Sequence, residues 1–262
     1  MLSLAVNRRT ALLFLGSGAG AVLMSACGGN TSNTESSASP LASSSSASST
    51  SSSETPSSAS PSASPSRRNS FQRGFNVELN NADMEYTGEG YMYSTREKQG
   101  YGWPHPKRPQ EMSENSELGL YYSWAYASAG ISYAMKTGDD TYIKQSGMTE
   151  GDQKLFKSIA LLEETREGKY WEESGNFVYR LESDHPEKKG EEYSWPYQLQ
   201  MFHGDFYVRN GEVHEIPENT DGWGKIVYSD GTLKARYLDG AWQMEGFFEG
   251  IATNVVGKPF DK

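Results

Sequence analysis

SENSELGLYYSWAYASAGISYAMKTGD, residues 113–139, carries the strongest helical pattern in the chain. The side chain of Ser113 or Ser116 can accept a hydrogen bond from a free backbone N–H in the first turn of a helix. Gly138 can adopt the left-handed backbone conformation in which helices commonly end. Two apolar sets recur at helical spacing on different faces: Leu118, Tyr122, Ala125, Ala129 and Tyr133, and then Trp124, Ile131 and Met135. Such a helix is buried on more than one side, so this segment predicts the centre of the fold.

The chain after this helix first continues in helices and then changes to strands. The spacing of Leu155, Ile159 and Leu162 predicts a third helix, after a short second one. Residues 176–182 and 195–208 alternate as strands do. Three dipeptides, Asn210-Gly211, Asp230-Gly231 and Asp239-Gly240, are hairpin signals between further strands. The order predicts an α+β fold class, with three helices packed on an antiparallel sheet.

The first 26 residues have the pattern of an export signal. Arg8 and Arg9 supply its basic part, and an apolar stretch follows at residues 11–24. That stretch is too short and too rich in glycine to predict a membrane-spanning helix. The paired arginines also resemble a twin-arginine export signal, with Sec export as the other route.

A lipid anchor is expected at the only cysteine. Met24, Ser25 and Ala26 precede Cys27 as in a bacterial lipobox, although leucine is usual where Met24 stands. The resemblance implies a diacylglyceryl group on Cys27, and hence a protein held at the extracytoplasmic face of the cell membrane. An ordinary secretory signal, in which Cys27 is incidental, is the alternative.

The part of the chain after Cys27 divides by composition. Residues 27–69 are almost entirely small and polar, which predicts a disordered linker. Residues 70–105 form a Gly- and Tyr-rich arm in this interpretation, and residues 106–262 form the α+β domain.

Composition also excludes several classes of partner. One cysteine in 262 residues excludes an intrachain disulfide and a cysteine-rich zinc site. Removal of Arg8 and Arg9 with the signal leaves 22 basic against 34 acidic residues, a balance of −12. This acidic chain is not expected to bind nucleic acid, which attracts clustered lysine and arginine.

Several segments together resemble a known family. They are Pro109 with Met112-Ser113-Glu114, Tyr133 to Asp139, Ser146, and Asp239 to Met244. With the signal, lipobox and linker, they resemble an actinobacterial lipoprotein family with a C-terminal domain of unknown function (DUF6318-like), over roughly residues 106–248. The resemblance implies a nuclear-transport-factor-2-like cone, in which three helices cover a curved antiparallel sheet. Many members carry Cys-x-x-Cys after the serine, whereas residues 147–152 lack cysteine, so no redox role is implied here.

No catalytic motif stands out, and the family has no assigned activity. The sequence has no Gly-x-Ser-x-Gly, His-Glu-x-x-His or phosphate loop, and its four histidines lack metal-ligand spacing, so no metal and no cofactor are expected. One hypothesis places His203, Asp205 and Tyr207 on one strand face, opposite Tyr126 or Tyr133 in a pocket. His203 would act as the base and Asp205 would orient it. The plainer interpretation leaves the strand residues in solvent.

Three functions follow from these patterns. The first is a lipid-anchored extracytoplasmic protein whose domain binds a ligand or a protein partner without catalysis. The second is an enzyme that uses the pocket at His203. The third is a module for cell-wall glycan, and an exposed row of Tyr91, Tyr93, Tyr101 and Trp103 would favour it.

Overall fold

The computed structural model describes residues 70–88, 90–218 and 224–252. The predicted signal, the lipobox with Cys27 and the linker to residue 69 lie outside these ranges. Within them, no helix is both long enough and apolar enough to cross a membrane.

The predicted central helix is α1 (Glu117–Thr137), and both of its ends form as the sequence indicates. Ser116 Oγ accepts the backbone N–H of Gly119 at 3.1 Å, and this interaction caps the first turn. Gly138 follows the last turn with φ of +76°, in the left-handed region that glycine adopts without steric cost. Local residue chemistry therefore fixes the length of the helix.

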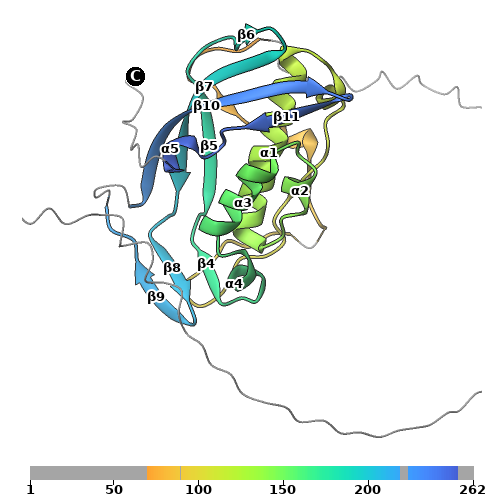
Figure 1. Ribbon diagram of the computed structural model, residues 1–262. Coiled ribbons are helices and arrows are strands. Elements are labelled where there is room, and N and C mark those ends of the chain that lie inside the picture. Colours follow the sequence, from red (N-terminus) through yellow and green to blue (C-terminus); the bar gives the residue numbers. More distant parts are fainter. Residues whose placement is uncertain (1–69, 89, 219–223, 253–262) are drawn as a thin grey trace, which may run out of the picture. The chain divides into compact units, whose positions relative to one another are not determined.

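The main sheet is antiparallel and packs against α1, with strands in the order β1-β5-β7-β10-β11 and β6 added beside β7 (Figure 1). Its strands are β1 (Asn76–Val77), β5 (Asn176–Leu181), β6 (Glu187–Lys189), β7 (Glu192–Phe202), β10 (Ile226–Leu238) and β11 (Ala241–Glu245). Phe177, Tyr179 and Leu181 of β5 are all buried, so the predicted alternation of that strand is confirmed.

Two smaller sheets complete the strand content. The strands β2 (Met84–Glu85) and β3 (His105–Pro106) pair with each other. The third sheet has the order β4-β8-β9, from β4 (Tyr170–Glu172), β8 (Phe206–Arg209) and β9 (Glu212–Glu215). All pairings in both sheets are antiparallel.

Besides α1, the helical elements are short. They are the 3-10 turns η2 (Asn81–Asp83) and η3 (Gln110–Ser113) and the helices α2 (Thr141–Lys144), α3 (Glu150–Ile159), α4 (Leu162–Arg166) and α5 (Glu249–Ala252).

Aromatic side chains hold α1 against the main sheet. The Trp124 ring lies 5.6 Å from Tyr179, 6.0 Å from Trp195 and 5.6 Å from Tyr197, measured between centroids. These residues are almost completely removed from solvent. On the side of α1 that faces α2, Gly130 allows a close approach, because a Cβ there would lie 3.1 Å from Tyr142 Cβ. Contacts on two sides of α1 therefore agree with the predicted burial on more than one side, although Leu118, Ala129, Tyr133 and Met135 are only partly buried.

The predicted arrangement of three helices on one curved sheet, with a nuclear-transport-factor-2-like cone, is wrong. In the described part of the chain, the strands fall into three separate antiparallel sheets, and only α1 and α3 of the five α-helices exceed five residues. The predicted third helix stops early because Ala160 is extended, which separates α3 from α4. The structure is rich in strands rather than in helices.

A glycine divides what the sequence predicts as one strand, residues 195–208. Gly204 has φ of +85°, and the chain leaves the main sheet there, so β7 and β8 belong to different sheets. A side chain at this position would also collide with the preceding segment, since its Cβ would lie 2.7 Å from Glu173 Cβ. The alternation predicted for residues 195–208 therefore runs through the bend, so the sequence pattern does not indicate where the strand ends.

Two of the three predicted hairpin turns are confirmed. Asn210 and Asp239 have φ of +53° and +52°, and each is followed by a glycine that also has positive φ, as tight two-residue turns require. The third prediction is wrong, because Gly231 lies inside β10, directly opposite Tyr197. A Cβ at Gly231 would stand 2.5 Å from Tyr197 Oη, so this glycine makes room for the ring.

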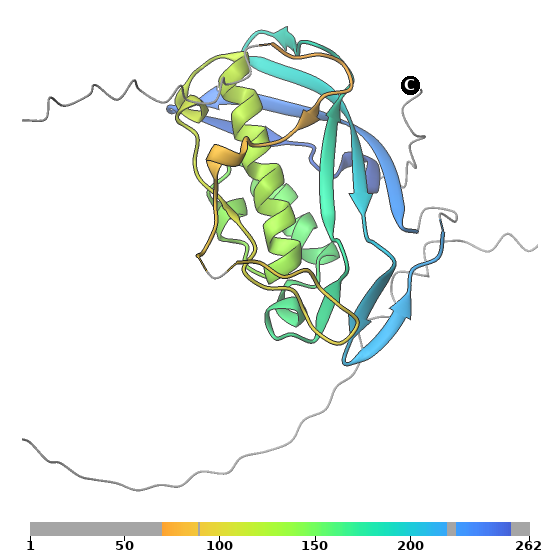
Figure 2. The ribbon, with the colours of Figure 1, turned by 180° about the vertical axis from the view of Figure 1, so that it is seen from behind.

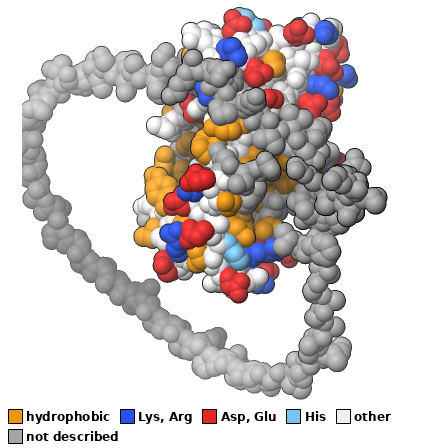
Figure 3. Space-filling model, turned by 90° about the vertical axis from the view of Figure 1, so that its left-hand side faces the viewer, with side chains coloured by type: hydrophobic (Ala, Val, Ile, Leu, Met, Phe, Trp, Pro, Cys, Tyr) orange, Lys and Arg blue, Asp and Glu red, His pale blue; other side chains and the backbone are white. Residues whose placement is uncertain are grey.

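The face of the molecule in Figure 3 carries acidic and basic side chains mixed at its two ends, with hydrophobic side chains exposed between them. The basic side chains on this face do not gather into a patch of their own.

Candidate functional site

The arm ahead of α1 forms a hairpin that is fastened to distant parts of the fold. Met92 and Tyr101 exchange two backbone hydrogen bonds of 3.0 and 3.1 Å. Gln99 Nε2 donates to the carbonyl oxygen of Lys136 at 3.3 Å and to that of Thr165 at 2.9 Å. In Figure 2 the arm runs past the C-terminal end of α1 toward β9. These contacts place the arm beside α1 and α4.

Glycines allow the arm to close tightly. Gly102 has φ of +68°, and a Cβ there would overlap the carbonyl oxygen of Gly90. A Cβ at Gly100 would lie 2.7 Å from both Met92 O and Trp103 Cζ2. Glycine is therefore needed at positions 100 and 102 for this backbone path.

The arm presents an aromatic cluster, defined as Tyr86, Tyr91, Tyr93, Tyr101 and Trp103. The four tyrosines are exposed, Tyr93 most of all at 63%, whereas Trp103 is 8% exposed. Tyr91 and Tyr93 pack edge to face at 5.2 Å, and both rings lie within 6 Å of the Trp103 ring. The predicted exposed row is therefore present except for Trp103, which supports the tyrosines from beneath.

Beside this cluster lies an open cleft of about 340 Å³, which we call the aromatic cleft. Its wall is made by residues 99–103 of the arm, by Tyr133 and Lys136 of α1, and by Thr165 and Arg166 of α4. The indole N–H of Trp103 is buried and has no hydrogen-bond acceptor in the described part of the chain. A volume of this size falls at the lower end of small-ligand sites.

The cleft holds two cations. Lys136 Nζ lies 4.6 Å from the centre of the Trp103 ring and donates to Asn176 Oδ1 at 2.5 Å. Arg166 Nη2 donates to the carbonyl oxygen of Gly138 at 2.5 Å. Within residues 70–88, 90–218 and 224–252, no carboxylate is paired with either cation. Burial without a counter-charge lowers the pKa of Lys136 from 10.5 to about 8.

The residues of the predicted pocket are divided among different places. Tyr133 lines the aromatic cleft, and its ring packs on Tyr142 at 5.2 Å. Tyr126 lies farther along α1, where its hydroxyl hydrogen-bonds Gln145 Oε1 at 3.2 Å. His105 stacks on Tyr142 at 5.5 Å and also contacts Tyr133, with ring centroids 6.3 Å apart. Both predicted tyrosines therefore belong to the α2 side of α1.

His203 is buried at the end of β7 and contacts an acid that the sequence did not indicate. Its Nδ1 lies 3.0 Å from Glu172 Oε2 of β4, and both side chains are almost inaccessible. The other oxygen of Glu172 accepts the hydroxyl of Tyr170. Burial and the adjacent carboxylate raise the pKa of that phenol. This buried hydrogen-bonded chain joins the main sheet to the third sheet.

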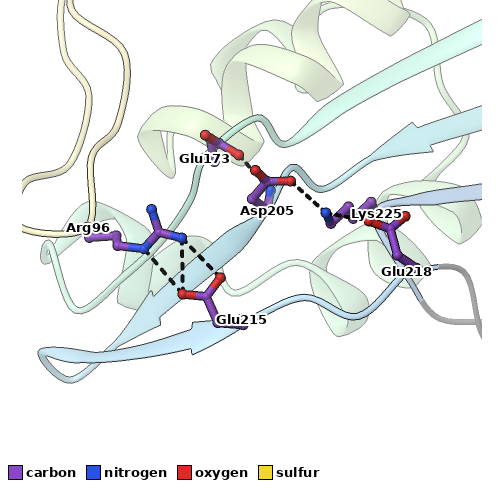
Figure 4. A network of polar contacts seen from close by, with 6 residues as sticks. All are labelled: Arg96, Glu173, Asp205, Glu215, Glu218 and Lys225. Carbon is purple, nitrogen blue, oxygen red and sulfur yellow. Dashed lines mark hydrogen bonds and ion pairs between the residues drawn. The ribbon is translucent and has the colours of Figure 1, made fainter.

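Asp205 and Tyr207 point to other partners. Asp205 is exposed, and Lys225 Nζ lies between its Oδ1 at 3.0 Å and Glu218 at 2.6 Å (Figure 4). Tyr207 stacks on His214 with centroids 4.7 Å apart. The predicted orienting role at the His203 ring is therefore taken by Glu172.

A second hollow, of about 230 Å³, lies near Asp152, Lys234, Glu245 and Glu249. Asp152 Oδ2 accepts the Gly246 N–H at 2.7 Å, and Thr149, which precedes α3, makes no side-chain cap. Among the described residues, no group of three or more His, Cys, Asp or Glu could hold a metal ion.

The residues predicted to serve export and lipidation lie outside the described ranges: Arg8, Arg9, Met24, Ser25, Ala26 and Cys27. The sequence did not indicate Lys136 and Arg166 as site residues. They lie in two different helices, and only the folding of the arm places Trp103 beside them. The Gly-Tyr-Gly-Trp segment was the signal that could have located the cleft.

Comparison with known proteins gives one match. A model of a family of unknown function, DUF6318, matches residues 89–247, which is well over half of the chain. The match begins inside the arm rather than near residue 106, so it includes most of the cleft lining and the strands from β3 to β11. No curated protein and no solved structure matches the chain. The resemblance seen in the sequence is thereby confirmed for this domain, and the chain belongs to the family of unknown function DUF6318.

Proposed function

We propose that this chain is a lipid-anchored extracytoplasmic protein whose folded domain binds cell-wall glycan, without catalysis, at the aromatic cleft. The observation that carries the binding role is the set of exposed tyrosines beside a cleft, of which Tyr91 and Tyr93 pack on Trp103. Large aromatic side chains normally become buried on folding, so a cluster held open to solvent supports a binding surface.

Aromatic faces suit sugars because a pyranose ring has a flat side of C–H groups that packs on a π-face, while its hydroxyls need donors and acceptors at the edges. The cleft offers both kinds of group. Tyr101 and Tyr133 supply the rings, and Thr165 and Lys136 supply polar groups. A non-catalytic role is supported by His203, which is buried against Glu172 away from the cleft.

The anchor is supported by the position of Cys27 directly after Met24-Ser25-Ala26 and before the serine-rich segment. Replacing Cys27 with Ala should remove incorporation of a labelled fatty acid and release the protein from the membrane fraction. Ser45→Ala, in the linker, is the matched control and should leave both unchanged. An unlabelled wild type together with unchanged membrane association of Cys27→Ala would show that the lipid anchor is absent.

Glycan binding can be tested by sedimentation of the full-length protein, purified in mild detergent, with insoluble peptidoglycan. The double variant Tyr91→Ala/Tyr101→Ala removes one exposed ring of the cluster and the exposed ring that lines the cleft. It should bind about tenfold more weakly, since each ring contact contributes about 0.5–1.5 kcal/mol. Leu238→Ala removes an exposed apolar side chain outside the cluster and should bind as the wild type does. Equal retention of wild type and the double variant would refute the site, and no retention of the wild type would refute the function.

A further inference from the structure

We infer that the saccharide bound in the aromatic cleft carries a carboxylate, which Lys136 and Arg166 receive. This inference rests on the proposed function and names the chemical class of its ligand. It starts from an imbalance of charge in the cleft, because its lining contains two cations and, in the described part of the chain, no carboxylate paired with them.

Lys136 is poised to bind an anion. An ammonium group has three N–H donors, and in the described part of the chain one of them is used, by Asn176. The aliphatic stem is held by burial and the charge is held over the Trp103 ring, 4.6 Å from its centre. Holding a cation in a partly buried position without a counter-charge is unfavourable, so a ligand carboxylate would relieve an existing cost.

The neighbouring groups match the rest of such a ligand. Trp103 is only 8% exposed and holds Lys136 Nζ over its ring, so it orients the cation. Tyr101 and Tyr133 supply rings to the cleft, and Arg166 on α4 provides further positive charge. A neutral sugar would use the rings and leave both cations without a paired carboxylate, whereas a uronic acid would use the rings and the cations together.

The chemistry of the cleft also argues against an inorganic anion as its ligand. A small anion would contact the cations alone and leave the aromatic cluster without function. The combination of stacked rings with unpaired cations is met by a sugar acid, in which the carboxylate is attached directly to the ring.

The test compares trigalacturonate with its trimethyl ester, which keeps the rings and removes the charge. Binding to the full-length protein in mild detergent is measured by isothermal titration calorimetry at pH 7 and two salt concentrations. The wild type should bind the acid at least tenfold more tightly than the ester, and added salt should weaken only the acid. Equal affinities for acid and ester would overturn the inference and leave the glycan site intact.

Two variants separate the charge of Lys136 from its packing. Lys136→Met should lower affinity for the acid at least tenfold and change affinity for the ester less than threefold, whereas Lys136→Arg should keep the preference for the acid. Lys154→Met, which removes an exposed lysine on α3, is the matched control and should behave as the wild type. An equal loss of both probes in Lys136→Met would overturn the inference.

Should Lys136→Met not fold, as judged by its melting curve, the acid–ester comparison in the wild type decides alone. If neither probe binds while the protein still sediments with peptidoglycan, the carboxylate inference is overturned and the proposed function stands. If sedimentation is lost as well, both are overturned.

Discussion

Substitution of Lys136 by Met gives the most direct test of the electrostatics of the cleft. Burial lowers the pKa of Lys136 from 10.5 to about 8, and each factor of ten in proton affinity is worth 1.36 kcal/mol. The folded protein therefore holds the charged form at a cost of about 3 kcal/mol relative to the unfolded chain. Methionine has a similar length and no charge, so the variant lacks this cost.

The sign of the pH dependence follows from proton binding. Below pH 8 the lysine is protonated in both the folded and the unfolded states, and the full cost is present. Between pH 8 and 10.5 the unfolded chain keeps a proton that the folded protein has released, so the free energy of unfolding rises with pH. By pH 9.5 this gain amounts to about 2 kcal/mol.

Urea unfolding followed by tryptophan fluorescence at pH 7.0 and pH 9.5 measures the effect. The free energy of unfolding of Lys136→Met minus that of the wild type should fall by about 2 kcal/mol between the two pH values. Other titrating groups cancel in this difference. Lys154→Met is the control, because Lys154 is exposed and its difference from the wild type should not depend on pH. A difference for Lys136→Met that is the same at both pH values would refute the buried-cation reasoning.

Three further predictions concern the backbone and the buried phenols. Gly102→Ala should lower the free energy of unfolding by at least about 1 kcal/mol and abolish peptidoglycan binding, since its left-handed backbone closes the arm; Gly88→Ala, which meets nothing within 4 Å, should do neither. Gly231→Ala should destabilise by roughly 1–3 kcal/mol in urea unfolding, because its Cβ would displace the ring of Tyr197; wild-type stability would contradict the packing described for β10. Burial raises the folded-state pKa of the Tyr170 and Tyr179 phenols, so their contribution to the free energy of unfolding is present below pH 10 and is lost above it. The free energy of unfolding should therefore fall above pH 10, and absorbance at 295 nm should report ionisation of these two phenols as the protein unfolds. Ionisation of Tyr170 and Tyr179 near pH 10 in the folded protein would contradict that last prediction.

The elements that could be predicted from the sequence are those whose causes are local. The Ser116 cap and the Gly138 terminus of α1 depend on residues within one turn, and the Asn210-Gly211 turn depends on two neighbours. The division of the strands into sheets has causes elsewhere in the chain. The bend at Gly204 is packed against Glu173, and Gly231 is explained by Tyr197 on the neighbouring strand. A dipeptide cannot reveal its cross-strand partner.

The candidate site divides in the same way. The arm was predicted as the place for exposed rings because tyrosine and glycine are concentrated in it. Lys136 and Arg166 could not be connected with Trp103, since the connection runs through Gln99, which bonds the carbonyl oxygens of α1 and α4. At His203, spacing along a supposed strand pointed to Asp205, whereas the structure brings Glu172 from 31 residues away.

The fastening of the arm has a consequence for the order of folding. Gln99 bonds Thr165, Trp171 Nε1 bonds the carbonyl oxygen of Thr95, and Arg96 pairs with Glu215, across separations of 66, 76 and 119 residues. Contacts that close such long loops form late, because closing the loop costs chain entropy and that cost is offset only once the distant partners are in place. The ligand site would therefore be completed near the end of folding, and partly folded chains would not compete with the finished protein for its ligand.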